Sequence, residues 1–358
     1  MSSRVFLLLI GLIFFGGYYY WNGHTKKSEI FVKHSSKSSG EQSISLMTFN
    51  VENFYDIEND PQKNDDTFLP IHLKKNRKHK EQCQKIRRKK WREECLFLDW
   101  SSAKFKDKAR KIAQVIEQAN PDIVVLQEVE NLFALNKIQG SFEKIEVFPT
   151  QVLIEGRDYR GIDIALLARF PVGDMGLGLN YADLGKKMVD VRGILTVPLK
   201  ISKNQLLYVL GVHFPAPFHP YFSRKKSWEK VNELVSRIQK KFDSPVVVLG
   251  DLNITSKERQ EENWDQVWKQ EKWSAAHEMR SIKSKGTAYY APKRRWSFLD
   301  RIFLREGNKW KLVPGSAKVI NSLSFQKDQY GRPARYQSSG DGFSDHWPLF
   351  AEIQEVSH

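Results

Sequence analysis

Short apolar runs that each end in a polar residue constrain the fold of this chain most. They are Ile44–Phe49, Ile123–Leu126, Tyr208–Val212 and Val246–Leu249. Their length and β-branched content predict buried strands. Lys104–Ala119 and Arg224–Phe242 repeat apolar residues at helical spacing and predict amphipathic helices. Some strands follow one another directly and others are joined by helices, which predicts an α+β or mixed-sheet α/β fold rather than a regular βαβ repeat.

Polar residues stand at the ends of these runs, where a buried core does not require them. They are Asn50, Glu128, His213, Asp251, Asn253, Asp300, Asp345 and His346. Each alone is explained by an ordinary turn or loop. Loops at strand ends are also where sheet proteins usually carry function. Four carboxylates, two amides and two histidines together predict a hard-metal centre beside an acid–base pair, and oxygen ligands favour Mg²⁺ or Mn²⁺ over zinc.

These residues lie in six short motifs, which in chain order are TFNVEN, LQEVEN, GVHF, GDLN, SFLDRIFL and SDHWPL. Motifs of this kind, in this order over residues 44–355, resemble the endonuclease/exonuclease/phosphatase superfamily with its DNase I-like fold. NVENFYD and RGIDIALL resemble a bacterial branch of it. The resemblance implies an α/β fold: a four-layer sandwich of two packed mixed β-sheets flanked by helices.

The resemblance also implies hydrolysis of phosphate esters by metal-activated water. Glu128 would hold Mg²⁺ or Mn²⁺ with the help of Asn50 and Asp345. Glu52 occupies a position where many relatives have an acid, and it would support the metal. The sequence leaves open whether one metal or two are used.

The same resemblance assigns roles to the catalytic candidates. Asp251 would orient or deprotonate the attacking water, and Asn253 would contact the phosphate. His346 would act at the phosphate, held and polarised by Asp300. His213 matches a second histidine of DNase I-like and sphingomyelinase-like members, which argues against the apurinic endonuclease branch.

Substrate contacts are less specific in the sequence. Asn50 and Asn253 are candidates, as is Arg160 in the segment YRGID. The alternative for Arg160 is a structural salt bridge with Asp158 or Asp163.

Basic residues outnumber acidic ones by 57 to 42, which gives a net charge of +15. Such a surface suits a polyanionic partner, so the leading prediction is a nuclease on DNA or RNA. The basic segment APKRRWSF would help to hold the strand. The alternatives are a lipid or small-molecule phosphodiesterase or phosphatase, and a catalytically inactive, membrane-tethered binding protein. We expect a monomer without an obligate protein partner.

The N-terminus carries no charge from Val5 to Trp21. We predict a signal anchor or signal peptide over residues 1–21, a flexible tether over 22–43 and the catalytic domain over 44–358. A positive-inside count would keep the domain cytoplasmic, but an N-terminal apolar segment favours a membrane-anchored or exported protein. Export would make Cys83 and Cys95 a disulfide, whereas a cytosolic protein would hold two free thiols.

A basic insertion follows the first strand. Residues 72–92 contain eleven Lys or Arg and a single acid, Glu81. The sequence leaves two interpretations open, a solvated helical face and a specific contact.

Overall fold

The computed structural model describes residues 43–307, 309–336 and 341–356. The predicted signal segment and nearly all of the predicted tether lie outside them. Among the described residues, no helix is both long and apolar enough to cross a membrane.

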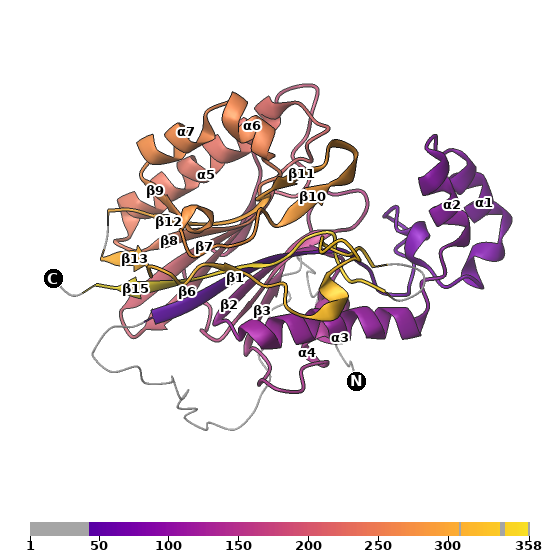
Figure 1. The fold of residues 1–358 in the computed structure, drawn as a ribbon, viewed down its shortest axis with the longest axis horizontal. Coiled ribbons are helices and arrows are strands. Elements are labelled where there is room, and N and C mark those ends of the chain that lie inside the picture. The colour runs from indigo at the N-terminus through magenta and orange to yellow at the C-terminus, as the bar shows by residue number, and fades with distance from the viewer. Residues whose placement is uncertain (1–42, 308, 337–340, 357–358) are drawn as a thin grey trace, which may run out of the picture. The chain divides into compact units, whose positions relative to one another are not determined.

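The described chain forms two mixed β-sheets (Figure 1). The first has seven strands in the order β13-β15-β1-β2-β4-β3, with β14 paired to β15. Their bounds are β1 Ser43–Phe54, β2 Ile123–Val129, β3 Thr150–Leu153, β4 Asp163–Ala168, β13 Trp310–Leu312, β14 Lys318–Val319 and β15 Leu349–Glu355. β1 pairs in parallel with β2 and antiparallel with β15, so the sheet is mixed.

The second sheet has six strands in the order β5-β6-β7-β8-β12-β9. Their bounds are β5 Gly178–Asn180, β6 Ile194–Ser202, β7 Gln205–His213, β8 Val246–Asp251, β9 Trp273–Ala275 and β12 Asp300–Arg305. A separate two-stranded ribbon pairs β10 (Ala288–Tyr290) with β11 (Arg295–Ser297).

Helices cover the outer face of each sheet (Figure 1). The first sheet is covered by α3 (Ser102–Ala119) and α4 (Leu132–Gln139). The second is covered by α5 (Tyr221–Lys241), α6 (Ser256–Glu261) and α7 (Trp264–Gln270). The four layers and both mixed sheets confirm the predicted DNase I-like α/β sandwich.

Three apolar clusters hold the layers together. Leu46, Val125 and Ile302 belong to the cluster between the sheets. Ile112 belongs to the cluster under α3, and Trp228 to the cluster under α5. All five side chains are buried almost completely, so removing this apolar surface from water is the main force holding the layers together.

One predicted strand boundary differs from the structure, and one motif spans two strands. β1 does not end before Asn50 but continues to Phe54, because a bulge with positive φ at Glu52 (55°) and Asn53 (53°) lets it stay paired with β2. The segment WSFLDRIFL is not one strand. It divides into β11, which pairs with β10, and β12, which pairs with β8 and β9.

The basic insertion forms two short helices, α1 (Arg77–Gln84) and α2 (Lys89–Phe97). A disulfide joins Cys83 of α1 to Cys95 of α2. Of the two thiol states that the sequence allowed, the structure has the one expected for an exported domain.

Candidate active site

Three predicted catalytic residues lie side by side across the second sheet. The register of β7 and β8 places His213 beside Asp251, and the register of β8 and β12 places Asp251 beside Asp300. Gly250 allows this alignment, since a Cβ there would lie 1.9 Å from the Val212 carbonyl oxygen. The sheet itself therefore sets the spacing of the two carboxylates and the imidazole.

The first sheet brings Asn50 and Glu128 to the same place. Glu128 stands in a β-bulge with φ of 67°, where the register of β2 and β4 shifts. The Asn50 amide lies 3.1 Å from Oδ2 of Asp251 and 3.4 Å from Oε1 of Glu128. The backbone N–H of Asn53 donates to Oε2 of Glu128 at 2.8 Å. Asn50 thus connects the polar ends of the two sheets.

His346 and Asp300 form a buried pair. Nδ1 of His346 lies 2.7 Å from Oδ2 of Asp300, and a carboxylate can only accept, so Nδ1 donates. Ser344 Oγ accepts from the His346 backbone N–H at 3.0 Å and donates to the Asn50 carbonyl at 2.7 Å. Burial alone would lower the pKa of His346, but the charges of Asp300 and Asp251 outweigh it and raise that pKa well above its usual range. His346 is therefore held as a cation.

Asp251 is the most central carboxylate. Its Oδ1 accepts from the Asn253 backbone N–H at 2.8 Å, and the Asn253 amide donates to the Phe214 carbonyl at 3.0 Å. Burial raises the pKa of Asp251 to about 6, against the opposing effect of His346. A carboxylate with such a pKa is a competent proton acceptor near neutral pH.

His213 is neutral. Burial lowers its pKa well below the usual value, and the nearby Arg192 and Arg160 lower it further. Its Nε2 lies 3.8 Å from Glu128 and 3.7 Å from Asp251, and these are polar contacts rather than ion pairs because the imidazole is uncharged. Within the described part of the chain, Nδ1 of His213 has no hydrogen-bond partner.

Glu52 and Asp345 form a second carboxylate group with Arg335. Arg335 bonds to Glu52, and its Nη2 lies 3.3 Å from Asp345. Oε2 of Glu52 accepts from the Asp345 backbone N–H at 3.0 Å. Burial, then the charge of Asp345, raises the pKa of Glu52 to about 7. Because Arg335 engages Glu52, this side chain is better placed to support a ligand than to be one.

Two basic residues of the site were missed from the sequence. Arg335 lies in a segment without a motif, so no local signal points to it. Lys108 donates to the Glu52 carbonyl from the buried face of α3. A lysine on the apolar face of an amphipathic helix was a usable signal, because a buried lysine is rare unless it is paired.

The structure is compatible with both interpretations of Arg160, a structural salt bridge and a phosphate contact. It forms the predicted salt bridge, with Nη2 3.3 Å from Asp158. Arg192 shares that carboxylate at 3.2 Å. The Arg160 side chain keeps 32% of its surface exposed, so it remains able to contact a phosphate.

The donor set fits a hard divalent cation. The predicted metal residues lie in two contacting pairs, Asn50 with Glu128 and Glu52 with Asp345. In the described contacts Glu128 accepts only from neutral N–H donors, and His213, 3.8 Å away, is uncharged. No salt bridge to Glu128 therefore competes with a metal ion in these contacts. Carboxylate and amide oxygens are the ligands Mg²⁺ and Mn²⁺ take.

A second grouping could also hold an ion, since ligand atoms of Asp251, Asp300 and His346 all lie within 4.8 Å of one another. Nδ1 of His346 is already bound to Asp300, which makes this group better suited to holding a proton than a metal. The metal assignments made from the sequence stay predictions.

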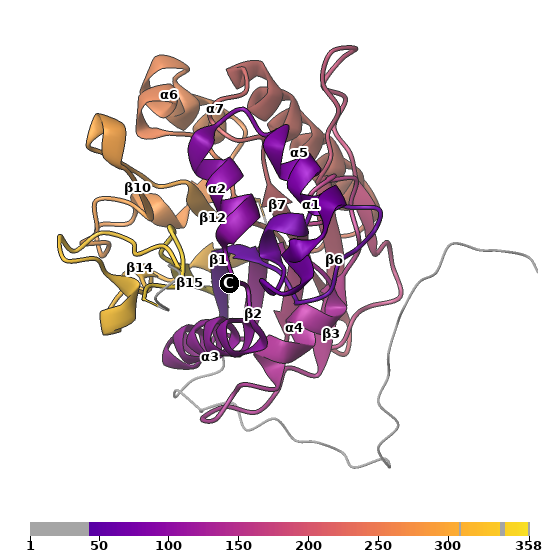
Figure 2. The same cartoon turned by 90° about the vertical axis from the view of Figure 1, so that its right-hand side faces the viewer.

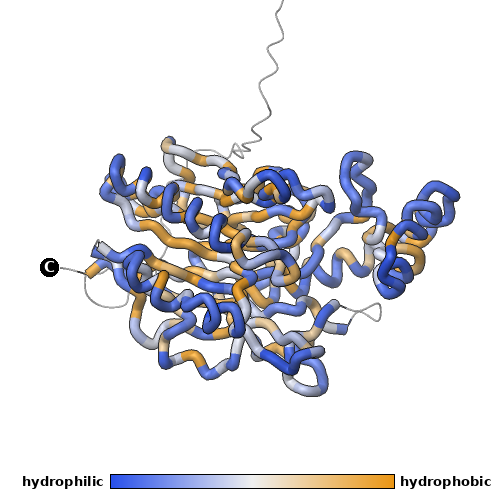
Figure 3. Tube along the Cα trace, turned by 90° about the horizontal axis from the view of Figure 1, so that it is seen from above, coloured by the Kyte–Doolittle hydropathy of each residue, from blue (hydrophilic) through white to orange (hydrophobic). Residues whose placement is uncertain are grey.

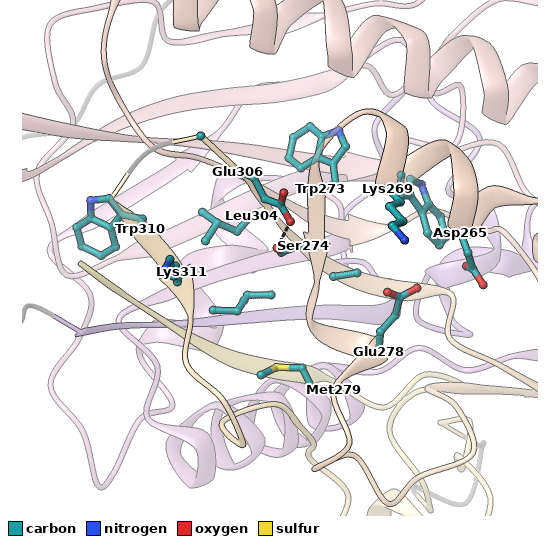
Figure 4. Close-up of a pocket in the computed structure, with 14 residues that line it drawn as sticks. Asp265, Lys269, Trp273, Ser274, Glu278, Met279, Leu304, Glu306, Trp310 and Lys311 are labelled. Atoms are coloured by element: carbon teal, nitrogen blue, oxygen red, sulfur yellow. Dashed lines mark hydrogen bonds between the residues drawn. The ribbon is translucent and has the colours of Figure 1, made fainter. Parts of the chain in front are cut away.

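A pronounced pocket lies elsewhere. It measures about 870 Å³ and is lined by residues of β9, β12 and β13, including Trp273, Leu304 and Trp310 (Figure 4). None of the predicted site residues lines it. The polar cluster at the strand ends, and not this pocket, carries the chemistry described above.

The two packed sheets with an acid–histidine pair at their polar ends define the class: this is the phosphoesterase fold of the endonuclease/exonuclease/phosphatase superfamily. Residues 96–355 match the Endonuclease/Exonuclease/phosphatase family. The chain belongs to this family. Its members are generally hydrolases of phosphate esters that use a divalent metal. Asn50 and Glu52 precede the matched span.

Solved structures share the fold at low sequence identity. An endonuclease/exonuclease/phosphatase family protein from Bacteroides thetaiotaomicron is similar with a TM-score of 0.55 and 15% identity, over 89% of this chain and 100% of that one. A truncated Caenorhabditis elegans TDP2 is similar with a TM-score of 0.51 and 14% identity, over 88% of this chain and 99% of that one. A protein from Enterococcus faecalis described as functionally unknown is similar with a TM-score of 0.52 and 17% identity, over 87% of this chain and 99% of that one. Among curated proteins, none matches the sequence.

Proposed function

We propose that the protein hydrolyses phosphodiester bonds of DNA or RNA, with little sequence specificity and with Mg²⁺ or Mn²⁺ bound at Glu128. One observation carries the hydrolase part of this proposal. The buried Oδ2 of Asp251 lies 3.1 Å from Asn50, 3.7 Å from His213 and 3.9 Å from His346. A carboxylate surrounded by an amide, a neutral imidazole and a cationic imidazole is equipped to handle protons at a phosphate.

The residues divide the reaction between them. Asp251 accepts a proton from the attacking water as the new oxygen–phosphorus bond forms. The bond from phosphorus to the leaving ester oxygen breaks in the same step, and that oxygen takes up a proton from solvent. His346, cationic through Asp300, donates a hydrogen bond to a non-bridging phosphate oxygen, where negative charge grows. Neutral His213 is a second hydrogen-bond donor or acceptor at the phosphate. A divalent ion bound beside them would neutralise charge on the phosphate and acidify water.

The β10–β11 ribbon favours a nucleic-acid substrate. Lys293, Arg294 and Arg295 are exposed at its turn. The ribbon is attached to the site, because Ala288 forms a bridge with His346 and the Trp347 N–H donates to the Thr287 carbonyl at 2.8 Å. Cations held next to the reacting phosphate would bind neighbouring phosphates of one strand.

A lipid phosphodiester is the second candidate. Three aromatic side chains follow β7 and His213 closely and are exposed: Phe218 (79%), Tyr221 (45%) and Phe222 (41%). Exposed aromatic groups suit a membrane interface as well as a stacked base. The predicted N-terminal anchor would place such an enzyme at a lipid surface. We keep the anchor, the exported location and the monomeric state as proposals.

An inactive binding protein is the third reading. Every residue that the resemblance assigns to catalysis is present in the sequence, which argues against it.

The test is a substrate panel with the full-length protein. Plasmid DNA, RNA, sphingomyelin and a phosphomonoester are each incubated with Mg²⁺, Mn²⁺ or EDTA. We expect metal-dependent nicking that is lost in Asp251→Ala and His346→Ala. Lipid turnover without nicking would replace the nuclease by the second candidate, and no turnover on any substrate would support the binding protein.

A further inference from the structure

The α1–α2 hairpin is a dense and mostly unneutralised positive surface. Nine of the eleven Lys and Arg of residues 72–92 are exposed, the exceptions being Lys74 and Arg92. Arg77, Lys89 and Lys90 pair with acids four residues away. Among the described residues, the other six make no ion pair: Lys75, Lys78, Lys80, Lys85, Arg87 and Arg88. Figure 3 shows the trace at this end of the molecule as mostly hydrophilic.

The hairpin is held in one shape. The disulfide joins its two helices, and Nε2 of buried His79 lies 2.9 Å from the Cys95 carbonyl. Buried Lys74 donates to the carbonyls of Thr67 and Leu98, at 2.7 Å and 2.6 Å. A pre-organised cationic surface loses little conformational entropy when it binds a ligand, so it binds more tightly than a flexible basic loop of equal charge.

Both ends of the insertion are attached beside the active site. It leaves β1 at Tyr55, shortly after Asn50 and Glu52, and the Tyr55 hydroxyl donates to the Arg160 carbonyl at 3.0 Å. It returns at Trp100, whose indole N–H donates to the Tyr55 carbonyl at 3.0 Å. In Figures 1 and 2, α1 and α2 lie beyond the end of the sheets toward which β1 runs.

We propose that the α1–α2 hairpin is a binding arm for the phosphate backbone of a nucleic-acid strand whose scissile phosphate lies in the active site. This inference rests on the nuclease activity proposed above and names how that substrate is held. A helix of eight residues spans about 12 Å. Along the axis of a duplex, the phosphates of one strand follow one another at about 3.4 Å, so α1 laid along that axis covers three or four of them.

Two further features favour a nucleic-acid strand over an anionic membrane. The hairpin is attached to the strand that carries Asn50 and Glu52, so a polymer with its scissile phosphate in the site can extend to the hairpin, whereas a single lipid head group cannot reach both. Trp91 is 49% exposed with the Arg88 guanidinium 4.4 Å above its ring, an aromatic and cation pair on which a base can stack.

The test removes four unpaired charges: Lys78→Gln, Lys80→Gln, Lys85→Gln and Arg87→Gln in the full-length protein. Binding of a fluorescent 20-nucleotide oligothymidylate is measured by anisotropy in EDTA, between 50 and 300 mM salt. Each phosphate contact on a single strand contributes about 0.7 to the salt slope. We therefore expect the slope to fall by roughly 3 and Kd at 150 mM salt to rise on the order of 100-fold.

The matched control removes four exposed lysines at the opposite end of the sheet: Lys200, Lys203, Lys240 and Lys241. β7 begins just after Lys203 and runs toward the site, and α5 ends at Lys241 before β8 begins. We expect the control variant to bind the oligonucleotide within a few-fold of wild type. Both variants should hydrolyse the small ester bis(p-nitrophenyl) phosphate at the wild-type rate. If the quadruple variant misfolds, two double variants replace it, Lys78 with Lys80 and Lys85 with Arg87. Each double variant should bind the oligonucleotide about 10-fold more weakly than wild type.

Three outcomes would overturn the arm. In the first, the hairpin variant binds the oligonucleotide as tightly as the control variant and nucleic-acid hydrolysis is intact. This result rejects the binding arm and keeps the nuclease. Another is loss of binding to phosphatidylserine vesicles with unchanged oligonucleotide binding, which makes the hairpin a membrane contact. The third is a wild-type protein that hydrolyses no nucleic acid with either metal, which removes the nuclease and the arm together.

Discussion

At the residue scale, the site depends on opposite protonation states of two buried histidines. His346 has a carboxylate at 2.7 Å and is cationic, whereas His213 is neutral because burial and two nearby arginines disfavour its charge. The same residue type can therefore act as a fixed cation at one position and as a neutral hydrogen-bonding group at the other.

Asp300→Asn tests the origin of the His346 charge. Without the Asp300 carboxylate, the pKa of His346 falls, so the imidazole loses its proton at a lower pH than in wild type. We expect kcat to fall by roughly 10²-fold or more at pH 8. The alkaline limb of the pH–rate profile should move to lower pH. An unshifted alkaline limb would show that Asp300 does not maintain the His346 cation.

Asp163→Asn tests a buried acid outside the catalytic group. Asp163 Oδ1 accepts from the Gly156 N–H at 2.7 Å, and burial raises the pKa of Asp163 to about 7. Between about pH 4 and 7 the folded protein holds this proton and the unfolded chain does not, so Asp163 makes stability fall as pH rises. Asn cannot ionise and can still accept that bond.

Urea unfolding at pH 5 and pH 8 measures the effect. We expect the Asn variant to gain about 2 to 4 kcal/mol relative to wild type on going from the lower to the higher pH. A difference in unfolding free energy that stays constant with pH would contradict the raised pKa.

At the element scale, the alignment of β7 with β8 sets the distance between His213 and Asp251. Gly250→Ala would place a methyl group 1.9 Å from the Val212 carbonyl oxygen, so the strands must separate. We expect a loss of about 3 kcal/mol or more in unfolding free energy together with loss of activity. Gly178→Ala is the control, because a Cβ there meets nothing within 4 Å. Equal stability of the two variants would show that this close approach does not matter.

The disulfide should stabilise the local structure of α1 and α2 and have little effect on the rest of the domain. Cys83 and Cys95 are twelve residues apart in the sequence. We expect thiol-reactive labels to modify neither cysteine in the denatured but unreduced protein until a reductant is added. Reduction should then speed tryptic cleavage within residues 77–92 while cleavage at Lys240 and Lys241 is unchanged. Labelling of both cysteines without reductant would contradict the bond.

The sequence predicts elements well where local patterns agree with the tertiary structure. The run Val246–Leu249 lies in β8, and Lys104–Ala119 lies in α3, because both patterns are apolar at the expected period. The bulges at Glu52 and Glu128 could not be foreseen, since they depend on pairing with distant strands. α1 and α2 lack an apolar face of ordinary width, and a disulfide and buried His79 fix them instead.

At the scale of the whole molecule, the catalytic residues come from segments far apart in the chain that only the two-sheet packing unites. Motifs made Asp251 and Asp300 visible one at a time. The register of β8 and β12 makes them neighbours. Arg335 contacts both Glu52 and Asp345. It lies 283 residues after Glu52 in the sequence, and no motif predicts that contact.

The distribution of charge extends this arrangement beyond the site. The β10–β11 ribbon is attached to His346, and the α1–α2 hairpin is attached near Glu52. If both bind one strand, hydrolysis of plasmid DNA should weaken steeply as salt rises, whereas hydrolysis of bis(p-nitrophenyl) phosphate should change little. Steady-state KM for each substrate between 50 and 300 mM salt measures this. Equal salt dependence for the two substrates would argue against an extended binding surface.

Hydrolysis of bis(p-nitrophenyl) phosphate tests the central claim most directly, because it reports the chemical step without an extended binding surface. The rates of wild type and Asp251→Asn are compared with Mn²⁺ and with EDTA. We predict that wild type is active only with the metal and that the variant is slower by about 10² to 10⁴-fold. Hydrolysis that persists in EDTA, or an Asp251→Asn variant as fast as wild type, would contradict a metal-dependent phosphodiesterase centred on Asp251.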